Sequence, residues 1–121
     1  MEKTSYTELK VWQKSMDMVE EVYKVTSKIP EEEKYGLVAQ LRRAAISVPS
    51  NIAEGYGRIT TKEYVKFLAI ARGSSSEVET QLLICQRLNY LSTTDILTSM
   101  SLIREIGKMI SAIINKLGER N

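Results

Sequence analysis

The chain has 121 residues, one cysteine, no histidine and a formal net charge of +2. Its length suits a single domain, and its content of 43% hydrophobic and 26% charged residues is typical of a globular protein. The lack of histidine excludes Ser–His and Cys–His nucleophile pairs, imidazole zinc sites and the Glu-x-x-His motif of di-iron bundles. We therefore expect no enzymatic activity, no cofactor and no metal site.

No stretch of the sequence is typical of a membrane or secreted protein. The uncharged apolar runs are far shorter than the roughly 20 residues that span a bilayer, and the first ten residues contain no signal-peptide core. We expect a cytoplasmic protein with no membrane partner. The single cysteine, Cys85, lies in an apolar helical stretch and is expected to be a small buried side chain.

Apolar residues at spacings of three and four predict a first helix at about residues 7–28. Trp12 is expected to anchor this helix in the core, and stacking on a cofactor is the alternative. Pro30 ends the helix, because the residue before a proline is pushed out of the helical region. Three glutamates follow, and acids after a proline are typical of a helix start. A metal-binding acidic cluster is the alternative interpretation of these glutamates.

A second helix is predicted at about residues 32–57, and it carries an unusual polar stripe. Pro49 lies in its middle, where a missing backbone donor and a clash with the preceding turn predict a kink. The stripe recurs at spacings of three and four and consists of Gln40, Arg43, Ser47, Ser50, Asn51, Glu54 and Arg58. Such a stripe is expected to contact another subunit, a ligand or the interior of the bundle.

Two further helices are predicted at about residues 61–90 and 93–118, each after a capping box. The segment RGSSSE in the middle of the third is a poor helix former, but the periodicity continues through it, so we expect one long helix. A ridge of small residues on this helix should face the second helix; its members are Ala69, Gly73, Ser76 and Thr80. The fourth helix is apolar on two adjacent flanks, which predicts a deep position or contact with another chain.

No segment has the alternating pattern of a strand. Four helices joined by short loops predict an all-α fold, an antiparallel up-down-up-down four-helix bundle that spans residues 1–121 as one domain.

Basic residues concentrate in the middle of the chain. Residues 35–72 carry six Lys or Arg against two Glu, whereas residues 1–34 are slightly acidic and residues 73–121 are neutral. The six cations are candidate phosphate contacts: Arg42, Arg43, Arg58, Lys62, Lys66 and Arg72. The alternative is that they form ion pairs between subunits.

Nearly the whole chain resembles the bacterial four-helix bundle proteins associated with intervening sequences in 23S rRNA genes. The resemblance rests on LKVWQKSMDMVEEVYKVTSKIP, YGLVAQLRRAAISVPSNIAEGYGR and EYVKFLAIARGSSSEVETQLLI. Its most specific parts are Gln40-x-x-Arg43-Ala44-Ala45-x-Ser47-x-Pro49-x-Asn51-Ile52-Ala53-Glu54-Gly55 and Ala71-Arg72-Gly73-Ser74-x-x-Glu77.

The resemblance implies a left-handed antiparallel bundle that assembles into a homopentamer. The molecular activity of the family is not established, and a role in binding structured RNA is a suggestion. The fold is also similar to the accessory variability protein of diversity-generating retroelements, a basic pentameric bundle that works with a reverse transcriptase and nucleic acid. This chain is less basic than that role would require.

Two functions follow as hypotheses. The first is a ring-forming protein that binds RNA through its basic segment. The second is a structural or adaptor oligomer in which polar residues form intersubunit hydrogen bonds; these residues are Arg43, Asn51, Glu54, Arg72 and Glu77. Extra apolar stripes on the later helices favour assembly. An enzyme with Glu54 and Glu77 as paired carboxylates, and a small-molecule site in the centre of a ring, are the remaining alternatives.

Overall fold

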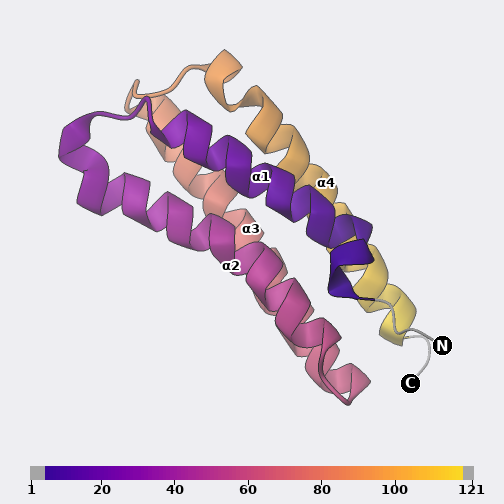
Figure 1. Cartoon of the computed structure of the whole chain (residues 1–121). Coiled ribbons are helices and arrows are strands. Elements are labelled where there is room, and N and C mark those ends of the chain that lie inside the picture. Colours follow the sequence, from indigo (N-terminus) through magenta and orange to yellow (C-terminus); the bar gives the residue numbers. More distant parts are fainter. Residues whose placement is uncertain (1–4, 119–121) are drawn as a thin grey trace.

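The computed structural model describes residues 5–118, which form four long helices and no strand (Figure 1). A short 3-10 turn, Tyr6–Glu8, precedes α1 (Lys10–Thr26), and α2 comprises Ala39–Tyr56. Helix α3 (Thr61–Arg87) follows α2 after a short turn, and α4 (Thr93–Gly118) completes the bundle. The predicted four-helix bundle is confirmed, while residues 1–4 and 119–121 of the predicted domain lie outside the described residues.

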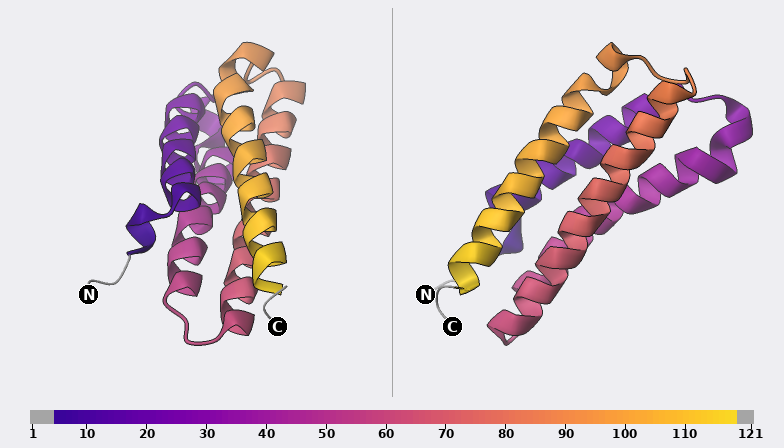
Figure 2. Two further views of the ribbon diagram at one scale, coloured as in Figure 1. Left: turned by 90° about the vertical axis from the view of Figure 1, so that its right-hand side faces the viewer. Right: turned by 180° about the vertical axis from the view of Figure 1, so that it is seen from behind.

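Each helix packs against its neighbours in sequence, and α1 closes the bundle against α4. The colours of Figure 2 show that the chain runs along the bundle and back again, so that the connections lie alternately at its two ends. The most extensive contact joins α2 and α3. Every helix contributes large buried side chains to one core, among them Met18, Val22, Leu41, Ile52, Leu68, Leu82, Ile106 and Ile110.

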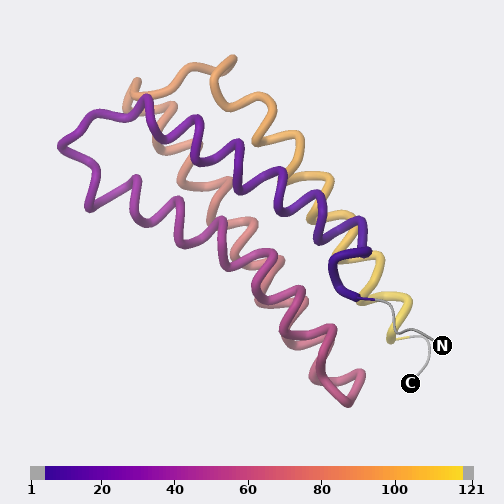
Figure 3. Tube along the Cα trace, viewed as in Figure 1, coloured from indigo at the N-terminus to yellow at the C-terminus, as the bar shows by residue number. Residues whose placement is uncertain are grey.

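The connection between α1 and α2 departs from the predicted helix. Glu31–Glu33 form a 3-10 turn, and Lys34–Val38 form a π-helical segment that is interrupted at Gly36, whose φ of −103° and ψ of −106° are not helical. Figure 3 shows the chain leaving the regular helical path between α1 and α2. The regular helix therefore starts at Ala39, later than residue 32. Pro49 is buried inside α2, and the kink expected there stays a prediction.

Of the two predicted capping boxes, the one at α4 forms completely, and at α3 one of its two hydrogen bonds forms. The backbone N–H of Glu63 donates to Thr60 Oγ1 at 3.2 Å. At the start of α4 the cap is reciprocal, because Asp95 N–H donates to Ser92 Oγ at 3.0 Å and Ser92 N–H donates to Asp95 Oδ2 at 2.9 Å. The third helix continues through the weak segment RGSSSE, as its periodicity predicted.

The expected orientation of the small-residue ridge is wrong. All four of its members, Ala69, Gly73, Ser76 and Thr80, are exposed, and a Cβ added at Gly73 would meet nothing within 4 Å. The physical reason is the position of the larger apolar residues of α3: Leu68, Val78 and Leu82 are fully buried and occupy the inward face. The ridge therefore lies on the opposite side of the helix.

Gly55 allows the close approach of α2 to α3. A Cβ built at Gly55 would lie 2.8 Å from Phe67 Cβ and 3.2 Å from the backbone oxygen of Tyr64. We predict that Gly55→Ala lowers the free energy of unfolding by roughly 1–3 kcal/mol, because neither neighbour can move without shifting α3. Urea denaturation followed by circular dichroism measures this.

The matched control is Gly107→Ala on α4, where an added Cβ meets nothing within 4 Å. This change should raise the unfolding free energy by roughly 0.5–1 kcal/mol through helix propensity alone. Equal changes in the free energy of unfolding for Gly55→Ala and Gly107→Ala would contradict the close packing of Gly55 against α3.

Asp95 makes the bundle sensitive to acid. Lys28 Nζ lies 2.8 Å from its carboxylate, and this hydrogen bond, with those from Ser92, lowers the pKa of Asp95 from 3.8 to about 2. A lowered folded-state pKa stabilises the fold above the unfolded pKa, and this stabilisation disappears as the pH falls from about 4 to about 2. Asp95→Asn should therefore reduce stability at neutral pH and have little effect near pH 2.

Denaturant titrations at several pH values test this dependence. Asp17→Asn is the control, because Asp17 is exposed and makes no ion pair or hydrogen bond within residues 5–118. If the difference in unfolding free energy between wild type and Asp95→Asn is constant across the pH range, the ionised carboxylate of Asp95 does not stabilise the fold.

Candidate functional site

Two uncharged members of the α2 stripe, Gln40 and Ser47, make hydrogen bonds to α3, and Asn51 supports Ser47, whereas Ser50 is exposed. Gln81 Nε2 donates to Gln40 Oε1 at 3.3 Å, and the hydroxyls of Ser47 and Ser74 are 2.8 Å apart. Asn51 Nδ2 donates to the backbone oxygen of Ser47 at 2.8 Å and to its hydroxyl at 2.9 Å. These five residues form a polar seam between α2 and α3 that fixes their register.

The charged members of the stripe lie outside this seam. Glu54 pairs with Arg58 at 2.5 Å, one turn along the same helix. Arg43 and Glu77 are exposed and make no ion pair or hydrogen bond with any residue in 5–118. Arg43, Glu54 and Glu77 therefore form no ion pair with one another within residues 5–118, and the intersubunit hydrogen bonds expected of them stay a prediction.

Glu54 and Glu77 do not form a carboxylate pair. Gly55 packs against Phe67, so Glu54 lies level with Phe67. Glu77 is ten residues farther along α3, which corresponds to roughly 15 Å along the helix. The structure thus contradicts the geometry that an enzyme with these two carboxylates would need.

Two of the six candidate phosphate contacts serve the bundle itself. Arg42 Nε donates to Thr26 Oγ1 at 3.0 Å, and its guanidinium lies 4.3 Å from the centre of the Tyr23 ring. Arg42 thereby ties α2 to α1. The Arg58 guanidinium lies 4.7 Å from the centre of the Phe67 ring in addition to its ion pair.

Three other cations are exposed and have no charged partner. Arg43, Lys62 and Lys66 make no ion pair or hydrogen bond with the residues that the structure describes. Lys62 and Lys66 are one turn apart at the start of α3. The contact between Ser47 and Ser74 places Arg43 beyond Ser74, so it is more than about 12 Å along the helix from Lys66. These cations are spread along the α2–α3 pair and do not form one patch.

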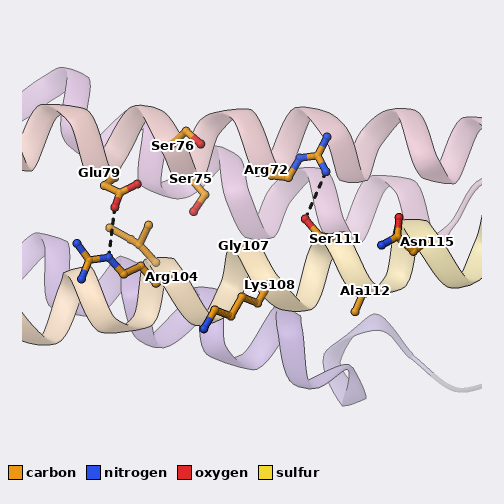
Figure 4. A pocket seen from close by; sticks show the side chains of 11 residues that line it. Arg72, Ser75, Ser76, Glu79, Arg104, Gly107, Lys108, Ser111, Ala112 and Asn115 are labelled. Carbon is orange, nitrogen blue, oxygen red and sulfur yellow. Dashed lines mark hydrogen bonds and ion pairs between the residues drawn. The ribbon is translucent and has the colours of Figure 1, made fainter.

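The sixth cation, Arg72, faces α4 and lines a groove of about 650 Å³ between α3 and α4 (Figure 4). We call it the α3–α4 groove, and its polar lining comprises Arg72, Ser75, Ser76, Glu79, Arg104, Lys108, Ser111 and Asn115. Arg72 Nη1 donates to Ser111 Oγ at 3.3 Å, and Arg104 Nε lies 3.5 Å from Glu79 Oε2. Arg43 does not line this groove, and Lys62 lines a separate pocket farther along the contact of α3 with α4.

Small residues create this groove. Ser75 is only 2% exposed and lies between the two helices, while a Cβ added at Gly107 would meet nothing within 4 Å. The candidate phosphate contacts expected from the sequence did not include Arg104 and Lys108 of α4, because net charge was compared by segment and residues 73–121 have no net charge. The available signal was the recurrence of polar residues once per helical turn at positions 104, 108, 111 and 115.

Cys85 is not a candidate nucleophile. It is fully buried, as predicted, and burial, with the nearby charge of Glu33, raises the pKa of its thiol. Tyr90 donates its hydroxyl to Glu33 Oε2 at 3.1 Å, and this hydrogen bond raises the pKa of Tyr90. Both groups therefore stay protonated at neutral pH.

Residues 5–118 contain no group of three or more His, Cys, Asp or Glu placed to hold a metal ion. Within the same range, no helix combines the length and the apolar character that crossing a membrane requires.

Comparisons with known proteins identify the family and support the fold. Residues 7–112 match the family described as 23S rRNA-intervening sequence protein. A crystal structure of a protein of unknown function from the S23 ribosomal protein family of Bacteroides thetaiotaomicron superposes with a TM-score of 0.79 at 22% identity, covering 86% of this chain and 97% of that chain. Among curated proteins there is no match.

Proposed function

The chain belongs to the 23S rRNA-intervening sequence protein family, and we propose that it is a non-enzymatic, self-assembling four-helix bundle. The resemblance described above implies a homopentamer. In this proposal the subunit acts as a structural or adaptor unit, and its function depends on the assembled ring.

The outward face of α3 carries this proposal. We define it as the exposed residues Ala69, Ile70, Gly73, Ser76, Glu77, Thr80 and Ile84. Between Lys66 and Arg87, the exposed cations one turn beyond its two ends, Glu77 is its single charged member, although the solvent side of a surface helix is usually rich in charge. The side chains of Ile70 and Ile84 are 42% and 40% exposed, and their burial against another copy would remove apolar surface from water.

Gly73 strengthens the argument, because a glycine inside a helix costs about 1 kcal/mol relative to alanine. Nothing in the isolated subunit requires a glycine there, since an added Cβ would meet no atom within 4 Å. The close approach of a second backbone would account for it. Arg43 and Glu77, which have no charged partner in the described chain, would then be available for an ion pair between subunits.

A ring needs a second, different surface on each subunit. An apolar cleft of about 360 Å³ between α1 and α2 is suited to that role, and its lining includes Tyr6, Trp12, Met16, Ile46 and Pro49. Tyr6, Met16 and Ile46 are each about two-fifths exposed. We propose that this cleft receives the outward face of α3 from the next subunit.

We predict that Gly73→Arg converts the oligomer into a monomer that keeps its helical content. The added side chain has room in the isolated subunit, but it would place bulk and charge in the proposed interface. Size-exclusion chromatography with light scattering measures the subunit number, and circular dichroism measures the fold.

Gly107→Arg is the matched control, because it adds the same side chain at an equally open site on α4 and should leave assembly intact. A wild-type protein that is monomeric at high concentration, or a Gly73→Arg variant with an unchanged subunit number, would refute the proposed interface.

A second proposed function is association with structured RNA through Arg43, Lys62 and Lys66. It is supported by their exposure and by the absence of charged partners within residues 5–118. Assembly would repeat these cations around a ring and increase the number of phosphate contacts.

We predict that the affinity of the wild-type protein for a structured RNA fragment falls steeply with salt concentration. Substitution of Arg43, Lys62 and Lys66 by alanine should weaken binding and reduce this salt dependence, because fewer counterions are released. Fluorescence anisotropy at low and moderate salt measures both. An affinity that is independent of salt would rule out the electrostatic model.

A further inference from the structure

We propose that the α3–α4 groove is a binding site for linked phosphate groups, as carried by an RNA strand or by a polyphosphate. This site goes beyond the self-assembly proposed above and does not require it. None of Arg43, Lys62 and Lys66 lines this groove. Figure 4 shows Arg72 and Glu79 of α3 directed toward Ser111 and Arg104 of α4.

The groove carries an excess of positive charge. Arg72, Arg104 and Lys108 line it, and Glu79 is the single acidic residue among the described residues of its lining. Glu79 lies 3.5 Å from Arg104, so it neutralises at most one of the three cations. Arg72 contacts the neutral hydroxyl of Ser111, and Lys108 has no ion pair or hydrogen bond with the described residues. Arg72 and Lys108 can therefore contact an anionic ligand without breaking an ion pair.

The spacing of these cations favours an elongated anion. Arg104 and Lys108 are one turn apart on α4, and the contact with Ser111 places the Arg72 guanidinium near the next turn. The three cationic side chains are thus attached or held at successive turns of α4, and one turn corresponds to about 5–6 Å along the helix. A row of cations matches a row of phosphates better than it matches a single compact anion.

The uncharged lining suits phosphate and sugar oxygens. Ser75, Ser76 and Ser111 offer hydroxyls, and Asn115 offers an amide at the end of the groove. Ser75 is 2% exposed and lies at the floor, facing Gly107 across the groove (Figure 4). No aromatic residue lines the groove, so bases could not stack there. We expect recognition of the backbone without a preference for sequence.

The test compares two triple variants with the same change in charge. One removes Arg72, Arg104 and Lys108 of the groove, and the other removes Lys10, Lys24 and Arg87, which are exposed and lie outside every surface proposed above, each by substitution with alanine. The probes are a short single-stranded oligouridylate, measured by fluorescence anisotropy, and inorganic tripolyphosphate, measured by calorimetry. Circular dichroism and light scattering report whether each variant keeps its fold and its assembly.

For wild type, three phosphate contacts on a single strand predict an affinity that falls about 20-fold between 50 and 200 mM salt. The groove variant should lose most of its affinity and its salt dependence, whereas the matched variant should bind the short strand as wild type does. Binding of both probes would show that linked phosphates suffice as the ligand. Binding of only one would identify the source as a nucleic-acid strand or as a free polyphosphate.

Gly107→Leu provides a variant without any change in charge. Its side chain would fill the groove from the open side of α4 and should weaken binding of both probes while assembly is unchanged. Three results would overturn the proposal: neither probe binds at low salt, the folded groove variant binds as tightly as wild type, or the matched variant loses affinity equally. Failure of the proposed assembly would be seen separately, in the light scattering of the wild-type protein.

Discussion

The close approach of α2 and α3 is the constraint on which the rest of the bundle depends. Three contacts set it: Gln40 with Gln81, Ser47 with Ser74, and Gly55 with Phe67. Successive contacts are seven or eight residues apart on each helix, so the same side of each helix faces its partner throughout. The polar seam specifies one register along this contact, and Gly55 removes the side chain that would hold the helices apart.

This register decides which residues of α3 remain outside. Once Leu68, Val78 and Leu82 face the core, Arg72 and Glu79 are directed toward α4, and Gly73, Ser76 and Thr80 are left on the outer surface. A single choice of register therefore produces both candidate surfaces. One is poor in charge and suited to another copy of the chain. The other combines cations with hydroxyls and is suited to phosphate.

Local features were predictable from sequence because neighbouring residues determine them. The capping pairs Thr60–Glu63 and Ser92–Asp95 lie three residues apart, and periodicity carried α3 through its weak central segment. The start of α2 was not predictable, because the break at Gly36 competes with a helix-start signal at Pro30. The orientation of the small-residue ridge depends on packing against two other helices, and spacing along one helix does not contain that information.

The same distinction explains why the basic segment was a poor guide to the site. Net charge over residues 35–72 counts Arg42 and Arg58, yet Tyr23, Thr26, Glu54 and Phe67 already occupy their guanidinium groups. It omits Arg104 and Lys108, which belong to a segment with no net charge but lie across from Arg72 in the folded chain. What matters for an anionic ligand is the number of cations without a partner on one surface. In this bundle that number is set by how α3 and α4 pack, because the two helices contribute the positive groups of the groove together.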